Sequence, residues 1–219
     1  MGQEKGGLVN NQEKIPVPNW NRRVDIDIAT GMLRQSNWGS TAGVSLSSYF
    51  DIDDLFAVDY RLNVSDRANL TRKAFIRQVE SIIEGIIQEH GIGRVAFIDK
   101  GGMGPLGSIW LALLTALELN VKLLLVRPWK ELISARIKGE APAQNERVLI
   151  FTDVVTTGGT VIDVAKVLKD YGAKAVATFA IVERDDTAIL DKRKEIIGDK
   201  MPVYCWKKAS EIMGLVKKN

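Results

Sequence analysis

Cysteine is scarce in this sequence, with Cys205 the only one among 219 residues. One cysteine cannot form an intramolecular disulfide, which fits a reducing compartment. Long hydrophobic runs are also missing. The longest apolar stretch, residues 109–119, is interrupted by Thr115 and Glu118 and is too short to span a bilayer. Residues 1–19 lack the apolar centre of a signal peptide, so we expect a cytoplasmic protein without a membrane partner.

A strong excess of charge of one sign is absent as well. The chain has 30 basic and 27 acidic side chains, for a net charge of +3, and no long run of like charges. This balance is too even to indicate a nucleic-acid surface, so we expect no nucleic-acid partner. The hydrophobic fraction of 46% is ordinary for a globular protein, and 219 residues suit one α/β domain with a small appendage.

Apolar and amphipathic segments alternate through most of the chain. Apolar side chains three and four residues apart predict a long helix from Leu70 to Ile87, which Gly91 and Gly93 would end. After it we expect strands at 94–99, 121–126, 148–151, 175–182 and 203–206, and helices at 107–119, 160–171 and 187–197. Strands that are apolar on both faces and separated by helices predict an α/β fold with a parallel β-sheet flanked by helices.

The N-terminal part is less regular. We divide the chain into a flexible N-terminal arm, a small N-terminal hood and a core, over residues 1–19, 20–65 and 66–219. Within the hood we expect a helix, a loop rich in serine and glycine, and a short strand, at residues 26–35, 36–48 and 49–56.

The most informative motif follows the predicted strand 148–151. Thr152, Asp153 and two valines lead into the run Thr156-Thr157-Gly158-Gly159-Thr160 at the start of an amphipathic helix. Two glycines let the backbone curl around an anion, while helix-start amides and three threonine hydroxyls supply donors. Asp153 could accept hydrogen bonds from sugar hydroxyls. The motif therefore indicates a site for a ribose phosphate, the alternative being an ordinary strand–turn–helix.

A second glycine-rich loop, residues 99–107, also lies between a predicted strand and a helix. Lys100 and the amides of Gly101 and Gly102 could bind a pyrophosphate. The same loop contains Gly-x-Gly-x-x-Gly over residues 102–107, which is the dinucleotide fingerprint.

The dinucleotide interpretation has one further point in its favour. Arg127 ends the next predicted strand, where an NADP enzyme could hold the 2′-phosphate. This alternative leaves the motif 153–160 unexplained. A ribose that carries both a phosphate and a pyrophosphate would use both loops. No Gly-x-x-x-x-Gly-Lys-Ser/Thr sequence occurs, which excludes a nucleoside triphosphatase P-loop.

The motif 153–160 resembles the signature of the type I phosphoribosyltransferases. Residues 45–51, 126–127, 182–185 and 202–204 are similar to segments of the orotate branch of that family. The resemblance implies the type I phosphoribosyltransferase fold and transfer of ribose 5-phosphate from phosphoribosyl pyrophosphate to a nucleobase. Orotate is the leading acceptor, for pyrimidine nucleotide synthesis, and a purine base is the alternative.

The resemblance also implies roles for individual residues. The catalytic residues would be Asp153, Lys130 and Arg127, and the 5′-phosphate would lie on Thr156, Thr157, Gly158, Gly159 and Thr160. Pyrophosphate would contact Lys100, Gly101, Gly102 and Arg127, and the base would contact Arg184, Tyr49 and Phe50. Mg²⁺ would neutralise the pyrophosphate without a dedicated set of protein ligands. A mobile loop over residues 128–146 would close on the site, and the partner would be a second copy in a homodimer.

The chain departs from the family pattern at three places. Thr152 stands where the family has the first of two adjacent acids, and Thr41 stands where the orotate branch has a lysine. The segment 127–133 lacks the usual histidine, and the only histidine, His90, is expected to be a surface or capping residue at a helix end. These departures leave a second hypothesis, a non-enzymatic sensor that binds phosphoribosyl pyrophosphate or a nucleotide.

Overall fold

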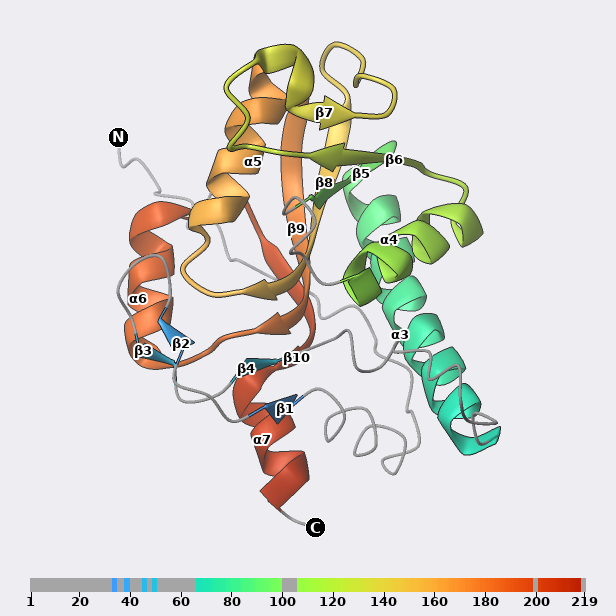
Figure 1. Cartoon of the computed structure of the whole chain (residues 1–219), viewed down its shortest axis with the longest axis vertical. Helices are drawn as coiled ribbons and strands as arrows, with labels where there is room; N and C mark the ends of the chain where they lie inside the picture. Colours follow the sequence, from blue (N-terminus) through green and yellow to red (C-terminus); the bar gives the residue numbers. More distant parts are fainter. Residues whose placement is uncertain are drawn as a thin grey trace, which may run out of the picture.

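A six-stranded sheet forms the centre of the computed structural model, which describes residues 33–34, 38–39, 45–46, 49–50, 66–99, 106–198 and 201–217 (Figure 1). The strands are β5 (Arg94–Ile98), β6 (Lys122–Val126), β7 (Ile137–Lys138), β8 (Arg147–Val155), β9 (Lys174–Glu183) and β10 (Val203–Lys208). Their order is β10-β9-β8-β5-β6-β7, and only the β6–β7 pair within this sheet is antiparallel. The predicted α/β fold class is confirmed.

Helices cover both faces of this sheet (Figure 1). On one face lie α3 (Asp66–His90), α4 (Leu106–Glu118) and α7 (Ala209–Lys217), and on the other lie α5 (Gly159–Asp170) and α6 (Thr187–Ile196). The predicted helices and strands of the core all appear, with ends within a few residues of the expected ones. The helix α7 was not predicted, because it is short and Gly214 interrupts its pattern.

Successive side chains of each strand point to opposite faces of the sheet, which divides the core into two layers. In β5, Val95 and Phe97 pack under α3 and α4, while Ala96 and Ile98 pack under α5. All four side chains are buried. Both faces of the strand are therefore covered, which explains why the sequence reads as a continuous apolar run.

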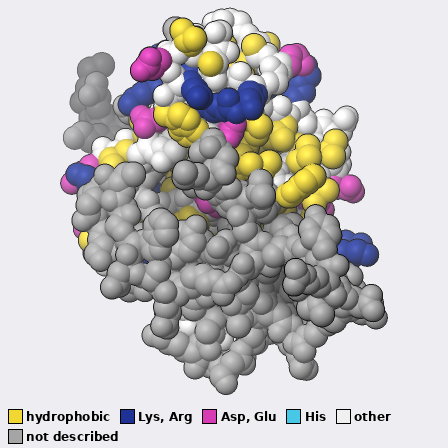
Figure 2. Space-filling view, viewed as in Figure 1, with side chains coloured by type: hydrophobic (Ala, Val, Ile, Leu, Met, Phe, Trp, Pro, Cys, Tyr) yellow, Lys and Arg dark blue, Asp and Glu magenta, His cyan; other side chains and the backbone are white. Residues whose placement is uncertain are grey.

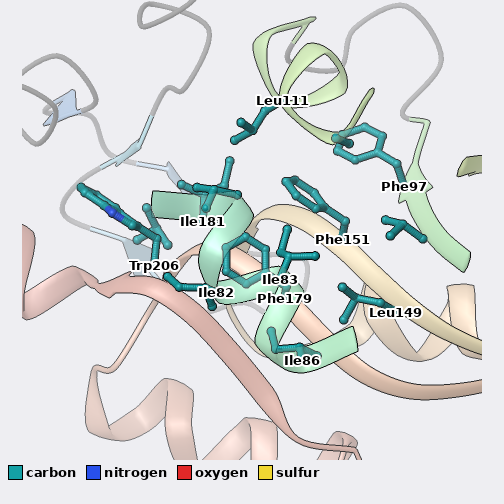
Figure 3. Packing of buried hydrophobic residues seen from close by; sticks show 14 of the residues in the cluster. Ile82, Ile83, Ile86, Phe97, Leu111, Leu149, Phe151, Phe179, Ile181 and Trp206 are labelled. Atoms are coloured by element: carbon teal, nitrogen blue, oxygen red, sulfur yellow. The ribbon is translucent and has the colours of Figure 1, made fainter. Parts of the chain in front are cut away.

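Aromatic rings connect the strands in the layer under α3 and α4 (Figure 3). The ring centroid of Phe151 in β8 lies 5.8 Å from that of Phe97 in β5 and 5.4 Å from that of Phe179 in β9. At the β10 edge, the buried indole N–H of Trp206 donates a hydrogen bond to Gln78 of α3. These contacts fix the strands whose carboxyl ends carry the predicted site.

Two short antiparallel pairs lie in the N-terminal part. Strand β1 (Leu33–Arg34) pairs with β4 (Tyr49–Phe50), and β2 (Trp38–Gly39) pairs with β3 (Ser45–Leu46). The predicted helix at 26–35 is wrong at residues 33–34, and its remainder lies outside the described residues. The loop predicted at 36–48 is likewise wrong at 38–39 and 45–46, which form β2 and β3, whereas β4 lies inside the strand predicted at 49–56. The division into arm, hood and core stays a prediction.

The segment 128–146 is partly built into the sheet. It contains a 3-10 turn, η1 (Ile133–Ala135), and the strand β7, which pairs with the end of β6. The amide of Arg127 donates to the carbonyl of Arg136 over 2.7 Å, which closes the turn. The mobile loop expected over residues 128–146 thus includes the sheet residues 137–138, and its closure stays a prediction. No helix among the described residues is long and apolar enough to cross a membrane.

Cys205 in β10 gives a first testable prediction. Its thiol donates a 3.4 Å hydrogen bond to the Glu183 carboxylate, and burial, reinforced by that negative charge, raises the pKa of the thiol. The thiolate is the reactive form, so we expect native Cys205 to resist iodoacetamide at neutral pH and to react after unfolding. Mass spectrometry checks this, and rapid alkylation of the native protein would contradict it.

Candidate functional site

The motif predicted to bind phosphate forms a single pocket at the carboxyl end of β8. Gly158 caps α5 with φ of 83°, and its carbonyl accepts the first helical hydrogen bond, 3.1 Å from the Ile162 amide. The pocket encloses about 50 Å³ and is lined by Ile98, Thr152 and residues 154–161. All five predicted phosphate-binding residues, 156–160, therefore surround one small cavity at a helix start, where amides favour an anion.

Asp153 lies inside β8 rather than after it, because the strand continues to Val155. Its side chain is 8% exposed. One carboxylate oxygen, Oδ1, accepts hydrogen bonds from the Val154 amide over 2.8 Å and from the Thr152 hydroxyl over 3.0 Å. Thr152, which replaces the family's first acid, thus orients the remaining acid, which lies between the pocket-lining residues Thr152 and Val154 in the chain.

Arg127 and Asp99 join the ends of two neighbouring strands. Arg127 Nε lies 2.6 Å from Asp99 Oδ2, and the Asp99 amide donates to the Val126 carbonyl over 2.9 Å. Both side chains are largely buried. Arg127 is therefore held at the carboxyl edge of the sheet by its pair with Asp99, and its contact with pyrophosphate stays a prediction.

Lys130 follows Arg127 in the turn after β6. Its amide donates to the Arg127 carbonyl over 3.2 Å, and its carbonyl accepts a 2.7 Å hydrogen bond from Arg136 Nε. The Lys130 side chain is exposed. The backbone of Lys130 is held by hydrogen bonds and its ammonium group is exposed, so the group is accessible to an anionic ligand. Its catalytic role stays a prediction.

Arg184 follows β9 beside the end of β8. Its amide donates to the Val155 carbonyl over 3.0 Å, and its guanidinium is buried, with Nε and Nη2 each 2.9 Å from Asp186 Oδ2. A substrate carboxylate would bind there in place of, or next to, the Asp186 carboxylate. The predicted contact with the base therefore remains a prediction.

The other predicted ligand-binding residues cannot be placed. Lys100, Gly101 and Gly102 lie outside the described residues. Tyr49 and Phe50 form β4, but their side chains are not described. The pyrophosphate loop and the contact of Tyr49 and Phe50 with the base therefore stay predictions. His90 lies at the end of α3, as expected, with Nε2 2.8 Å from the Tyr204 hydroxyl.

Arg193 was missed by the sequence reasoning. This residue of α6 is 7% exposed, and its Nε donates to the carbonyl of Thr156 over 2.8 Å. A signal was present, because Ile189, Arg193 and Ile197 are four residues apart and so share one helix face. A charged side chain on an otherwise apolar face indicates a buried cation with partners.

The fold, rather than the ligand, requires a glycine at position 158. A Cβ placed on Gly158 would lie 2.3 Å from Cδ1 of Ile197, and φ there is positive. We expect Gly158→Ala to lower the free energy of unfolding by at least about 1 kcal/mol, from the left-handed conformation alone. Gly159→Ala is the matched control, because nothing lies within 4 Å of its Cβ position. Equal denaturant midpoints for the two variants would contradict this account.

Comparison with known proteins identifies the family. No family model matches the chain. Over 150 residues the chain is 33% identical to the orotate phosphoribosyltransferase of Pyrococcus furiosus, covering 68% of this chain and 72% of the relative. Among solved structures, the orotate phosphoribosyltransferase of Aeropyrum pernix has a TM-score of 0.63 at 17% identity, covering 90% of this chain and 98% of its own.

A second solved structure shares the fold. The UMP synthase of Leishmania donovani has a TM-score of 0.62 at 22% identity, and the match covers 90% of this chain but 38% of that longer protein. These structural likenesses show the fold, and the sequence likeness to the Pyrococcus enzyme shows the family. The resemblance read from the motif at 153–160 is thereby confirmed: the chain belongs to the orotate phosphoribosyltransferase family.

Proposed function

We propose that this chain is a cytoplasmic transferase that moves ribose 5-phosphate from phosphoribosyl pyrophosphate to orotate, forming a pyrimidine nucleotide. The observation that carries the proposal is the pocket of residues 154–161 at a glycine-rich helix start, which directly follows the oriented carboxylate of Asp153 in the chain. Membership of the orotate phosphoribosyltransferase family supports orotate as the acceptor.

The donor would be held by its phosphate and its sugar. The amides of residues 156–160 bind the 5′-phosphate, because they lie at the positive end of the α5 dipole. Asp153 then accepts hydrogen bonds from the ribose hydroxyls, from a carboxylate already fixed by Thr152. Two anchored ends orient the ribose C1 atom toward the acceptor, which lowers the entropic cost of the reaction.

Charge stabilisation would supply the rest of the rate enhancement. Breaking the bond between C1 and pyrophosphate builds positive charge on the ribose ring, as in glycoside cleavage. The fixed negative charge of Asp153 favours that state. Arg127 and Lys130, with Lys100, are the cations that we assign to the departing pyrophosphate. Closure of the expected mobile loop within residues 128–146 would exclude water, which could otherwise hydrolyse the donor.

Magnesium fits this arrangement as an ion bound mainly through the substrate. No three His, Cys, Asp or Glu side chains gather to form a metal site in the described part of the chain. Mg²⁺ is commonly bound by substrate phosphates and one or two carboxylates. Pyrophosphate and ribose oxygens would then be its main ligands, with Asp153 as the adjoining carboxylate. The ion would neutralise charge on the leaving group.

An exposed apolar face of α4 supports a homodimer. Trp110, Leu114 and Leu117 share that face, with exposed fractions of 55%, 39% and 69%. Figure 2 shows hydrophobic side chains gathered over the same region. Contiguous exposed apolar surface of this kind is typical of a subunit interface. We propose that a second copy covers it. Sedimentation should show a dimer for the wild type and a monomer for Leu117→Glu, and a monomeric wild type would contradict the proposal.

Turnover with a panel of acceptors tests the proposed activity. The protein is mixed with Mg²⁺, phosphoribosyl pyrophosphate and orotate, adenine or hypoxanthine, and pyrophosphate release is followed. We expect release with orotate at a rate of roughly 1 per second or more. Release only with a purine would change the acceptor and keep the reaction. Binding of phosphoribosyl pyrophosphate without release of pyrophosphate in the presence of any of the bases would favour the non-enzymatic sensor.

A further inference from the structure

The guanidinium of Arg193 connects two parts of the candidate site through their main chains. Its Nε donates to the carbonyl of Thr156, the first residue of the phosphate loop, over 2.8 Å. Its Nη2 donates to the carbonyl of Arg184, which follows β9, and its Nη1 pairs with the Glu183 carboxylate. One side chain of α6 thus contacts the chain after β8 and the chain after β9.

The same helix face also covers the turn of the phosphate loop. Ile197, one turn after Arg193, packs against Gly158 so closely that a Cβ there would collide with it. The Glu183 carboxylate is fixed in turn, because its second oxygen accepts from the Cys205 thiol over 3.4 Å. The loop therefore packs against α6 through Arg193 and Ile197, while its pocket lies at the carboxyl edge of the sheet.

Stability alone does not explain a buried arginine at this position. Apolar residues of similar volume often replace buried ion pairs without loss of stability. Apolar side chains at positions 193 and 183 together could fill the space of this ion pair, but they could not donate hydrogen bonds to the Thr156 and Arg184 carbonyls. Arginine offers donors in a rigid planar fork, which suits three acceptors in fixed directions.

We propose that Arg193 is a positioning residue that fixes the phosphate loop relative to the acceptor-binding end of β9. Its effect is transmitted through the backbone of Thr156 and Arg184, since Nε, Nη1 and Nη2 each contact a protein acceptor. The phosphate half of this proposal requires only that the loop binds a phosphate monoester. The acceptor half rests on the proposed function.

Four variants separate positioning from stability. Arg193→Gln removes the fork, and Arg193→Lys keeps the charge but offers a single ammonium group. Glu183→Gln removes the ion pair and leaves both carbonyl hydrogen bonds to Arg193 in place. Lys192→Gln is the matched control, because it removes one positive charge from an exposed pair on the same helix. If Arg193→Gln fails to fold, the double variant Arg193→Gln, Glu183→Gln avoids an unpaired buried carboxylate.

Calorimetry with ribose 5-phosphate, steady-state kinetics and denaturant unfolding are measured on each variant. For Arg193→Gln we expect the Kd for ribose 5-phosphate and the KM values for donor and orotate to rise roughly tenfold or more, as when one hydrogen bond from a charged group is lost. Arg193→Lys should be intermediate. Glu183→Gln should lose stability yet bind ribose 5-phosphate like the wild type, and Lys192→Gln should match the wild type throughout.

Loss of stability without any change in Kd or KM would overturn the proposal and make Arg193 a purely structural residue. Equal weakening of ribose 5-phosphate binding by Glu183→Gln and Arg193→Gln would also overturn it, because the ion pair would then be the cause. A wild type that binds ribose 5-phosphate but does not use orotate contradicts the proposed function only. A wild type without affinity for ribose 5-phosphate contradicts both.

Discussion

Gly159→Val is expected to weaken binding of ribose 5-phosphate and of the phosphoribosyl donor strongly while the protein stays folded. Position 159 is the first residue of α5, and nothing lies within 4 Å of a Cβ placed there. Gly159 lines the pocket of residues 154–161, so a valine side chain there would take up space that we assign to the anion. Losing two or more hydrogen bonds to a charged ligand should weaken binding roughly 100-fold or more.

Gly214→Val is the matched control for this variant. Gly214 lies in α7, and its Cβ position is also open. Calorimetry should show wild-type affinity for ribose 5-phosphate in the control and an affinity weaker by roughly 100-fold or more in Gly159→Val, and neither protein should bind NADPH. If Gly159→Val kept its affinity for ribose 5-phosphate, or if the wild type bound NADPH tightly, the glycines of residues 102–107 would be the working loop.

Asp153→Asn should lower turnover strongly with little change in stability. The amide oxygen of asparagine can still accept hydrogen bonds from the Val154 amide and the Thr152 hydroxyl, so the local structure is preserved. The negative charge that favours the developing positive charge on the ribose is lost. Removing one fixed electrostatic contact of this kind typically costs about 10²–10³-fold in kcat.

Exposed Asp163 of α5 provides the control for Asp153. It pairs with Lys166 at the surface over 3.1 Å, so Asp163→Asn should keep wild-type kinetics and stability. Steady-state rates of pyrophosphate release and denaturant unfolding are compared for the two variants. Unchanged turnover in Asp153→Asn would mean that the ribose does not lie against this carboxylate.

The repeating pattern of the core was sufficient to predict its fold from the sequence. Strands such as β5 and β8 are apolar on both faces because helices cover both sides of the sheet. Their residues are therefore consecutively apolar, which can be recognised in the sequence. The phosphate loop was predictable for a related reason, since its glycines and threonines act within one continuous segment. Only its boundary with β8 was misjudged, because the sheet extends past Asp153 to Val155.

Features that depend on contacts between distant segments were not predictable in this way. Strand β1 forms where a helix was expected, because Leu33 and Arg34 pair with β4, and the local pattern does not indicate that pairing. Arg193 is likewise one of several charged residues in the sequence of α6, and its contact with the phosphate loop appears only in the folded structure. Its position on the face of Ile189 and Ile197 was the available signal.

A crystal structure with orotidine 5′-monophosphate, the product of the proposed reaction, tests the central claim most directly. We predict that its phosphate lies on the amides of residues 156–160, its ribose hydroxyls on Asp153, and its base near Arg184. All three contacts belong to one bound molecule, so the result tests their arrangement as well as their identity. A phosphate bound at residues 99–107, with the pocket of residues 154–161 empty, would contradict the account.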